Sequence, residues 1–171
     1  GVQANGCGAI WNLCDGDVEN VRHVRNAGGV EAVVGALNEH KNDCRVQLNG
    51  CAALCNLCAG DPGIRCLVAE TGGLEAIVWA LTGCGQRFDF NFNSGMLFYA
   101  CGALRHLVAE GGSSGDVIIR RRARKAGALG AVIHVLDTCK TSPNVQEQGC
   151  AVLEHLVPGD PDQIQMSNCS K

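Results

Sequence analysis

One segment recurs four times along this chain, and each copy carries a cysteine at the same position. The copies read GCGAIWNLC, GCAALCNLC, ACGALRHLV and GCAVLEHLV, and their aligned cysteines are Cys7, Cys51, Cys101 and Cys150. Successive cysteines are 44, 50 and 49 residues apart. Because a unit of this length cannot bury its own apolar face, a repeat at this period predicts units that stack on one another.

Each unit is predicted to hold three helices. Counted from the cysteine, positions −5, 0, +3 and +6 are apolar in every copy, and this spacing forms one stripe on a helix. A Gly-Asp turn follows in three copies, and its aspartate can cap the next helix. That short helix, over about residues 18–26, 62–71 and 116–126, should end at a glycine marker, and the third helix begins directly after it. The markers are Gly28, Gly72 and Gly127.

Three helices in about 44 residues, an Ala-Gly-Gly marker and a GALxNL-like helix resemble the armadillo repeat family. Residues 8–13 (GAIWNL) resemble the β-catenin-type GALWNL helix, and residues 101–107 (CGALRHL) resemble another helix of that group. The resemblance covers essentially the whole chain. It implies an all-α fold, a right-handed α-α superhelix of three-helix repeats, that serves as a protein-binding scaffold without naming a particular protein.

The period divides residues 1–171 into one armadillo-type array. We expect residues 1–14 to be the last helix of a preceding repeat and 158–171 to start a further one. The three units between them are 15–58, 59–109 with an insertion at 83–95, and 110–157 with an insertion at 111–115. Because solenoids need polar caps and neither end resembles one, we expect a fragment of a longer array. The alternative is a short array whose ends pair with a partner or another copy.

In the armadillo family the helix that holds the aligned cysteine lines a concave groove, so positions −2, +1 and +5 are expected to face into it. These positions are polar, small and polar in every unit. Asparagine offers a donor and an acceptor to a peptide group. In the armadillo family the asparagine at position +5 binds the ligand backbone, and in this chain only Asn12 and Asn56 match it. The alternative is that these amides satisfy backbone groups of neighbouring repeats. The polar columns are Asn12, Asn56, His106 and His155 at +5, and Asn5, Asn49, Tyr99 and Gln148 at −2.

Position +4 varies in chemistry, as specificity positions do, and holds Trp11, Cys55, Arg105 and Glu154. Trp11 and Arg105 are typical hot-spot residues, with rim packing as the alternative. His106 and His155 at position +5 would make peptide binding there less certain and pH-dependent. Nuclear-import adaptors of this family use tryptophan at +1, where this chain has only Gly or Ala, so a nuclear-localisation-signal receptor is not expected.

Two local features are candidate partner patches. Phe88, Phe90 and Phe92 alternate within the first insertion, which predicts an extended segment with all three rings on one side. They either pack on neighbouring helices or form an exposed apolar patch. Residues 120–125 (RRRARK) hold a basic cluster, which is either a solvated helix end or a surface for an acidic partner or nucleic acid. No aromatic residues are interleaved to stack on bases, so nucleic acid is not favoured. The arginines assigned to that surface are Arg120, Arg121 and Arg124.

The twelve cysteines first suggest a disulfide or metal protein. Alignment assigns six of them to core packing instead, at the aligned column and at Cys14 and Cys58. Cys55 and Cys58 form a CxxC, but there is no second CxxC, so we expect no metal and no cofactor. Reduced thiols then indicate the cytoplasm, with the nucleus also open. Whether Cys55 is reactive is left open.

The net charge of −3 gives no global attraction for nucleic acid, and no apolar run of 18 residues is present. No phosphate loop, HExxH motif or nucleophile elbow appears, so we do not expect an enzyme. The sequence favours a non-enzymatic scaffold that binds an extended peptide or a helix of a protein partner in the concave groove. The alternative is a structural subunit that docks into a larger complex through its ends and the Phe-rich insertion.

Overall fold

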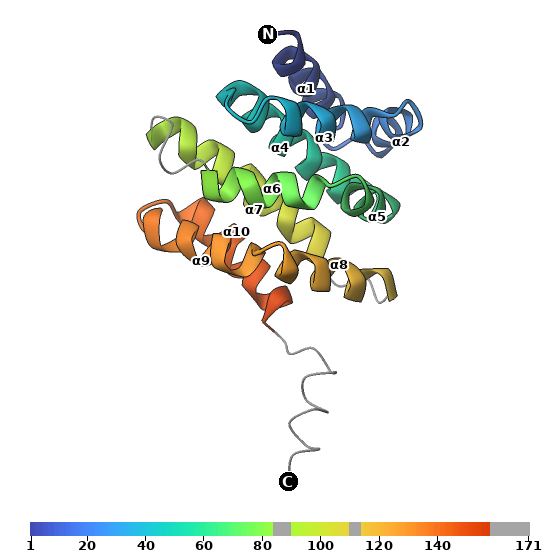
Figure 1. Ribbon diagram of the computed structural model, residues 1–171. Helices are drawn as coiled ribbons and strands as arrows, with labels where there is room; N and C mark the ends of the chain where they lie inside the picture. Colours follow the sequence, from blue (N-terminus) through green and yellow to red (C-terminus); the bar gives the residue numbers. More distant parts are fainter. Residues whose placement is uncertain (84–89, 110–113, 158–171) are drawn as a thin grey trace.

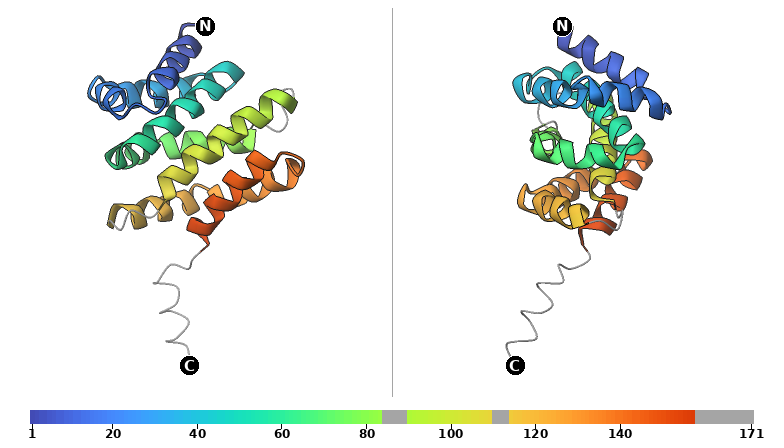
Figure 2. Two further views of the ribbon diagram at one scale, coloured as in Figure 1. Left: turned by 180° about the vertical axis from the view of Figure 1, so that it is seen from behind. Right: turned by 90° about the vertical axis from the view of Figure 1, so that its right-hand side faces the viewer.

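The structure is a computed structural model that describes residues 1–83, 90–109 and 114–157 (Figure 1). All the regular structure of these residues is helical. Four helices, each packed on the next, make one layer, which we call the inner layer. They are α1 (Val2–Leu13), α4 (Cys44–Gly60), α7 (Phe90–Val108) and α10 (Pro143–Leu156). Seen from behind, they cross the molecule as a row of parallel diagonals (Figure 2).

A second layer covers one side of the inner layer. It consists of α3 (Gly29–Glu39), α6 (Gly73–Gly83) and α9 (Ala128–Thr138), which pack on one another and on the inner helices. The short helices α2 (Val18–Asn26), α5 (Pro62–Glu70) and α8 (Ser114–Lys125) lie at one end of this layer (Figure 1). The three-helix unit therefore repeats along the stack, and the predicted all-α solenoid is confirmed.

The aspartates predicted to cap the short helices and the glycines predicted to end them do so in the structure. The side chain of Asp17 accepts a hydrogen bond from the backbone N–H of Asn20, and that of Asp61 accepts one from Gly63, so both cap a short helix. The glycine markers take the left-handed conformation, with φ of 77° at Gly28 and 87° at Gly127. A residue with a side chain rarely adopts this φ, so glycine is needed where one helix turns into the next.

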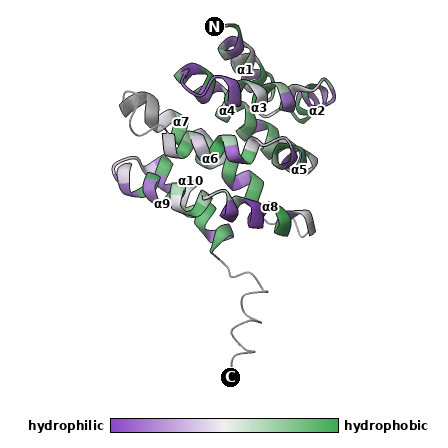
Figure 3. Cartoon of the chain, in the orientation of Figure 1, coloured by the Kyte–Doolittle hydropathy of each residue, from purple (hydrophilic) through white to green (hydrophobic). Residues whose placement is uncertain are grey.

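The apolar stripe forms the core between the two layers. Val46, Leu54, Met96 and Leu104 are each at most 1 % exposed. Glycine lets α3 and α4 approach closely, since a Cβ on Gly50 would lie 2.6 Å from a methyl of Leu37. Hydrophobic residues are concentrated on the helices in the middle of the stack (Figure 3). The core is thus continuous from repeat to repeat, as stacking units require.

The stripe is partly exposed on α1 and α10, the two end helices of the stack. Val2 is 82 % exposed and Leu13 is 52 % exposed, because no described helix covers that side of α1. Cys7 and Cys101 are buried under the next inner helix, whereas Cys150 on α10 is exposed. The prediction that Cys150 belongs to the buried column is therefore wrong, because no described helix packs beyond α10.

The first insertion lengthens a helix instead of forming an extended segment. α4 and α10 begin seven residues before their aligned cysteines, and α7 begins eleven residues before Cys101. Phe90 and Phe92 thus lie in the first turn of α7, and the predicted extended alternation is wrong for them. Phe88 lies outside the described residues. The second insertion similarly gives α8 12 residues, against 9 in α2 and α5.

Candidate functional site

Two asparagines of the polar columns, Asn49 and Asn56, bond to the backbone of the neighbouring repeat. Asn49 Nδ2 donates to the carbonyl oxygen of Ala4 at 2.8 Å, and Asn56 Nδ2 donates to that of Trp11 at 3.1 Å. Both bonds run from α4 back to α1. A carboxamide has two N–H donors and one acceptor, so one donor of each side chain is committed to the scaffold. Asn5 and Asn12, on α1, are exposed.

The same columns behave differently on α10. The Gln148 side chain stands where Asn49 stands on α4, but its Oε1 is buried without a hydrogen-bond partner. His155, at the Asn56 position, is half-buried and makes no hydrogen bond to α7 among the described residues. Hydrogen bonds from asparagine side chains therefore join α4 to α1, and no hydrogen bond of this kind joins α10 to α7 in the part of the chain that the structure describes.

Aromatic rings of α1 and α7 meet across the helix between them. The ring of Trp11 on α1 meets that of Tyr99 on α7 edge to face, with centroids 5.0 Å apart. Tyr99 in turn meets Phe98 at 5.1 Å. Because α4 lies between α1 and α7, the Trp11–Tyr99 contact crosses α4, where position +1 is only Ala52. We call Trp11, Phe98 and Tyr99 the aromatic shelf. Burial, the Cys55 thiol and Asp15 together raise the pKa of the Tyr99 hydroxyl.

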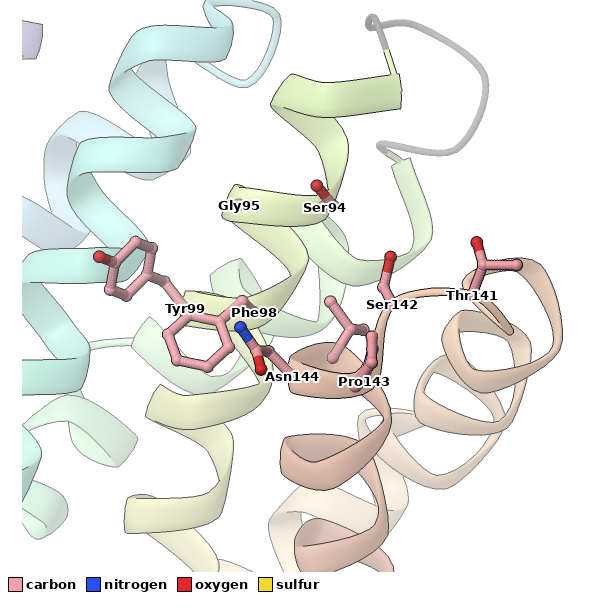
Figure 4. A pocket seen from close by; sticks show the side chains of 9 residues that line it. Ser94, Gly95, Phe98, Tyr99, Thr141, Ser142, Pro143 and Asn144 are labelled. Atoms are coloured by element: carbon pink, nitrogen blue, oxygen red, sulfur yellow. The ribbon is translucent and has the colours of Figure 1, made fainter.

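A cleft of about 440 Å³ adjoins the shelf. Figure 4 shows Phe98 beside Asn144 at the start of α10, and Tyr99 pointing away toward α4. Hydroxyl groups of Ser94, Thr141 and Ser142 line its other side. The cleft therefore offers aromatic surface on one wall and small polar groups on the other, which suits one side chain of a bound segment.

Arg105 is the one basic side chain at position +4. Its Nε is buried without a hydrogen-bond partner, and its Nη2 lies 3.4 Å from Nε2 of His106. Among the described residues no carboxylate oxygen comes within 4 Å of this guanidinium. Burial lowers the pKa of His106, and the charges of Arg105 and Arg65 lower it further. The neighbourhood of Arg105 is thus short of negative charge.

Cys55 lies between these groups and is half-buried. Burial raises the pKa of its thiol to about 11, and Arg105 offsets this only in part. The thiol is therefore protonated at neutral pH, and thiolate is the nucleophilic form. None of the ten described cysteines forms a disulfide, and the exposed ones are Cys66 and Cys150.

The basic cluster of α8 makes contacts within the scaffold. Nη1 of Arg124 lies 3.1 Å from the carbonyl oxygen of Leu156, and Nη1 of Arg120 lies 3.4 Å from that of Val108. Arg65 on α5 donates in the same way to Ala109, at 3.0 Å. These arginines hold the carboxyl ends of inner helices, where a positive charge is favourable. Arg121 is exposed, and the partner-surface interpretation of this cluster stays a prediction.

A repeated hydrogen-bond arrangement, in which a glutamine holds the end of the preceding helix, is not among the features predicted from the sequence. The Gln47 amide, which is 1 % exposed, donates to the carbonyl oxygens of Leu37 and His40 at the end of α3. Gln146 does the same for Leu136 and Cys139 at the end of α9. Both glutamines occupy position −4, where α1 has Gln3. A polar residue recurring beside an apolar stripe was the signal that could have revealed it.

No group of three or more His, Cys, Asp and Glu side chains is arranged to hold a metal ion in the part of the chain that the structure describes. Over the same residues, no helix combines the length and apolarity needed to cross a membrane.

Comparison with known proteins places the fold. Residues 17–59, which include α2, α3 and most of α4, match the family described as Armadillo/beta-catenin-like repeat. Two crystal structures of engineered proteins from the Northeast Structural Genomics Consortium are similar over 95 % of this chain, each with a TM-score of 0.74, at 23 % and 24 % identity. The chain spans 59 % and 60 % of their lengths. No curated protein matches the sequence. The resemblance to armadillo repeats is confirmed.

Proposed function

Because the chain folds as an armadillo-type solenoid, we propose that it is a non-enzymatic scaffold that binds an extended peptide or a helix of a protein partner. The binding surface is the face of the inner layer that is turned away from α3, α6 and α9. Armadillo repeats commonly bind proteins, and this fold is generally non-catalytic. The observation that carries the proposal for this chain is the aromatic shelf, in which rings from α1 and α7 meet across the intervening helix α4.

The shelf is suited to hold a partner because large rings give contact area at a low entropic cost. Asn12 is exposed and retains its amide for a peptide group, while Asn49 and Asn56 have one donor each committed to α1. We therefore assign anchoring mainly to side chains, with backbone contacts in support. The proposed binding residues are Asn5, Trp11, Asn12, Asn49, Asn56, Tyr99, Arg105, His106, Gln148 and His155.

Selection from a phage-displayed library of random 12-residue peptides tests the proposal. We expect binders whose affinity falls about 10- to 100-fold in a Trp11→Ala variant, as for an aromatic hot spot. The matched control is Trp79→Ala, because Trp79 lies on α6 in the second layer beside Lys41. Equal affinity for wild type and Trp11→Ala, or an equal loss with Trp79→Ala, would contradict binding at this surface.

The second candidate function is a structural subunit of a larger assembly. The apolar side chains of Val2 and Leu13, exposed on α1, favour it. Light scattering after size exclusion separates the two candidates. A stable oligomer that a Val2→Asp variant dissociates supports assembly, and a monomer at high concentration argues against self-association. The free thiols of the described cysteines support a reducing compartment, and we propose the cytoplasm or the nucleus.

A further inference from the structure

We propose that the partner places an acidic side chain, Asp or Glu, against the guanidinium of Arg105, next to an apolar residue that packs on the aromatic shelf. The inference rests on the proposed function and adds the chemical class of the bound segment.

The guanidinium of Arg105 has few hydrogen-bond partners within the described part of the protein. A guanidinium presents five N–H donors in a fixed plane. Here Nε is buried without a partner, and the nearest group to Nη2 is the imidazole of His106 at 3.4 Å. Because Nε lies beneath the surface, an incoming acceptor meets the Nη1 and Nη2 end of the guanidinium, which has no carboxylate partner among the described residues. Carboxylate is the acceptor that fits this fork with two parallel hydrogen bonds.

Positive charge exceeds available negative charge around Arg105. Arg65 on α5 is the other nearby cation, and its side chain is only 12 % exposed. It lies 3.5 Å from Asp116, so the local carboxylate is already paired. Glu154 occupies position +4 of α10, but it is exposed and makes no ion pair with Arg105. Arg65 and Arg105 thus have one carboxylate between them, that of Asp116, and it pairs with Arg65. A negatively charged ligand would pair with Arg105.

Tyr99 of the shelf and Arg105 are spaced so that one bound segment can contact both. Tyr99 and Arg105 are six residues apart on α7, which is about 9 Å along the helix axis. The two positions are also about 120° apart around the helix, so a segment that crosses α7 between them reaches both only because the Tyr and Arg side chains are long. In an extended segment, neighbouring side chains point to opposite sides. One side chain can therefore meet Arg105 while the next meets the shelf, which predicts an acidic residue directly beside an apolar or aromatic one.

The test uses the peptides selected from the random 12-residue library. We expect an Asp or Glu adjacent to an apolar residue to be enriched among them. For such a peptide, Arg105→Ala should weaken binding about 10- to 100-fold. Changing the peptide's Asp to Asn should cause a similar loss, and the two changes together should cost little more than either alone. Arg45→Ala is the control, because Arg45 is exposed at the start of α4 and lies outside the groove columns.

The outcomes separate the two proposals. Peptides that need Trp11 but lack an acidic residue, or that bind Arg105→Ala as tightly as wild type, overturn the anchor and leave the scaffold function intact. An equal loss with Arg45→Ala shows a general charge effect and also overturns the anchor. Binding that depends on neither Trp11 nor Arg105 overturns both proposals. Unchanged thermal unfolding of Arg105→Ala confirms that the loss reflects binding and not folding.

Discussion

The α1–α4 interface and the α7–α10 interface occupy equivalent places in the stack but treat their polar side chains in opposite ways. In the first, Asn49 and Asn56 each donate to a backbone carbonyl of α1. In the second, Gln148 leaves a buried oxygen unpaired and His155 bonds to nothing on α7 among the described residues. The two interfaces also differ in burial, since the aligned cysteine is buried on α1 and exposed on α10, but the contrast in hydrogen bonding is the one that bears on the polar columns.

The comparison shows how one repeat design supports two tasks. Where side-chain amides bond to the neighbouring helix, as between α4 and α1, the interface is stabilised and one N–H donor of each amide is used. Where they do not, polar groups such as those of Arg105 keep unused capacity, and this capacity is what a ligand needs. We therefore expect the α1–α4 interface to supply rigidity, while Arg105 on α7 keeps donors for recognition and Trp11 on α1 supplies part of the aromatic shelf.

Raising the pH above 9 should have the largest effect, because it acts on the buried thiols of α4 and α7 and spares α10. Burial raises the pKa of Cys55 to about 11 and that of Cys101 to about 12, from the ordinary 9.0. The unfolded chain loses these protons first. The free energy of unfolding is thus fully retained below pH 9 and falls above it, by about 1.4 kcal/mol per pH unit for each buried thiol until its folded pKa is reached.

Urea unfolding at pH 8, 9, 10 and 10.5 measures this loss. Cys101→Ala should make the pH dependence less steep, whereas Cys150→Ala should leave it unchanged, because Cys150 is exposed at the same repeat position. An equal change in both variants would show that the alkaline loss does not arise from burial of this column.

Removing one amide tests the comparison directly. Asn56→Ala should lower the free energy of unfolding by about 1–2 kcal/mol, since it removes the hydrogen bond to Trp11 and leaves that carbonyl unpaired. His155→Ala, at the equivalent position of α10, should change it by less than about 0.5 kcal/mol. Urea unfolding at pH 7 gives both values. If the histidine variant loses as much as the asparagine variant, the two interfaces do not differ as described.

Gln148→Leu should have the smallest effect and the opposite sign. It removes a buried oxygen that has no partner, and should raise the free energy of unfolding by up to about 1 kcal/mol. The matched change Asn49→Leu should lower it, because the Asn49 amide donates to Ala4 at 2.8 Å. A stability loss with Gln148→Leu would mean that its side chain contributes by packing.

Most of the fold could be predicted from the sequence because it follows from local rules. The apolar stripe, the aspartate caps and the glycine markers each act within a few residues, and all were located. Cys150 was misassigned because burial depends on what packs against a helix, and repeat position alone does not provide that. The Phe90–Phe92 alternation was misinterpreted because a helix can extend through a short insertion whatever its pattern.

The candidate site was less predictable, since it depends on which partner each polar group finds. The −2 and +5 columns were identified, but Asn49 and Gln148 share a column and differ in their bonding. The contact between Trp11 and Tyr99 joins residues 88 positions apart across an intervening helix. No local pattern encodes such a contact, because it depends on how three repeats are placed relative to one another.

The additional turn at the start of α7 has a consequence for symmetry. A strictly periodic stack would offer a long ligand several equivalent registers, each shifted by one repeat, and the ligand would be distributed among them. α7 extends four residues further than α4 and α10 relative to the aligned cysteine, and the cleft beside Phe98 lies near this extension. A ligand that uses this cleft therefore has one register, and its direction along the stack is fixed as well.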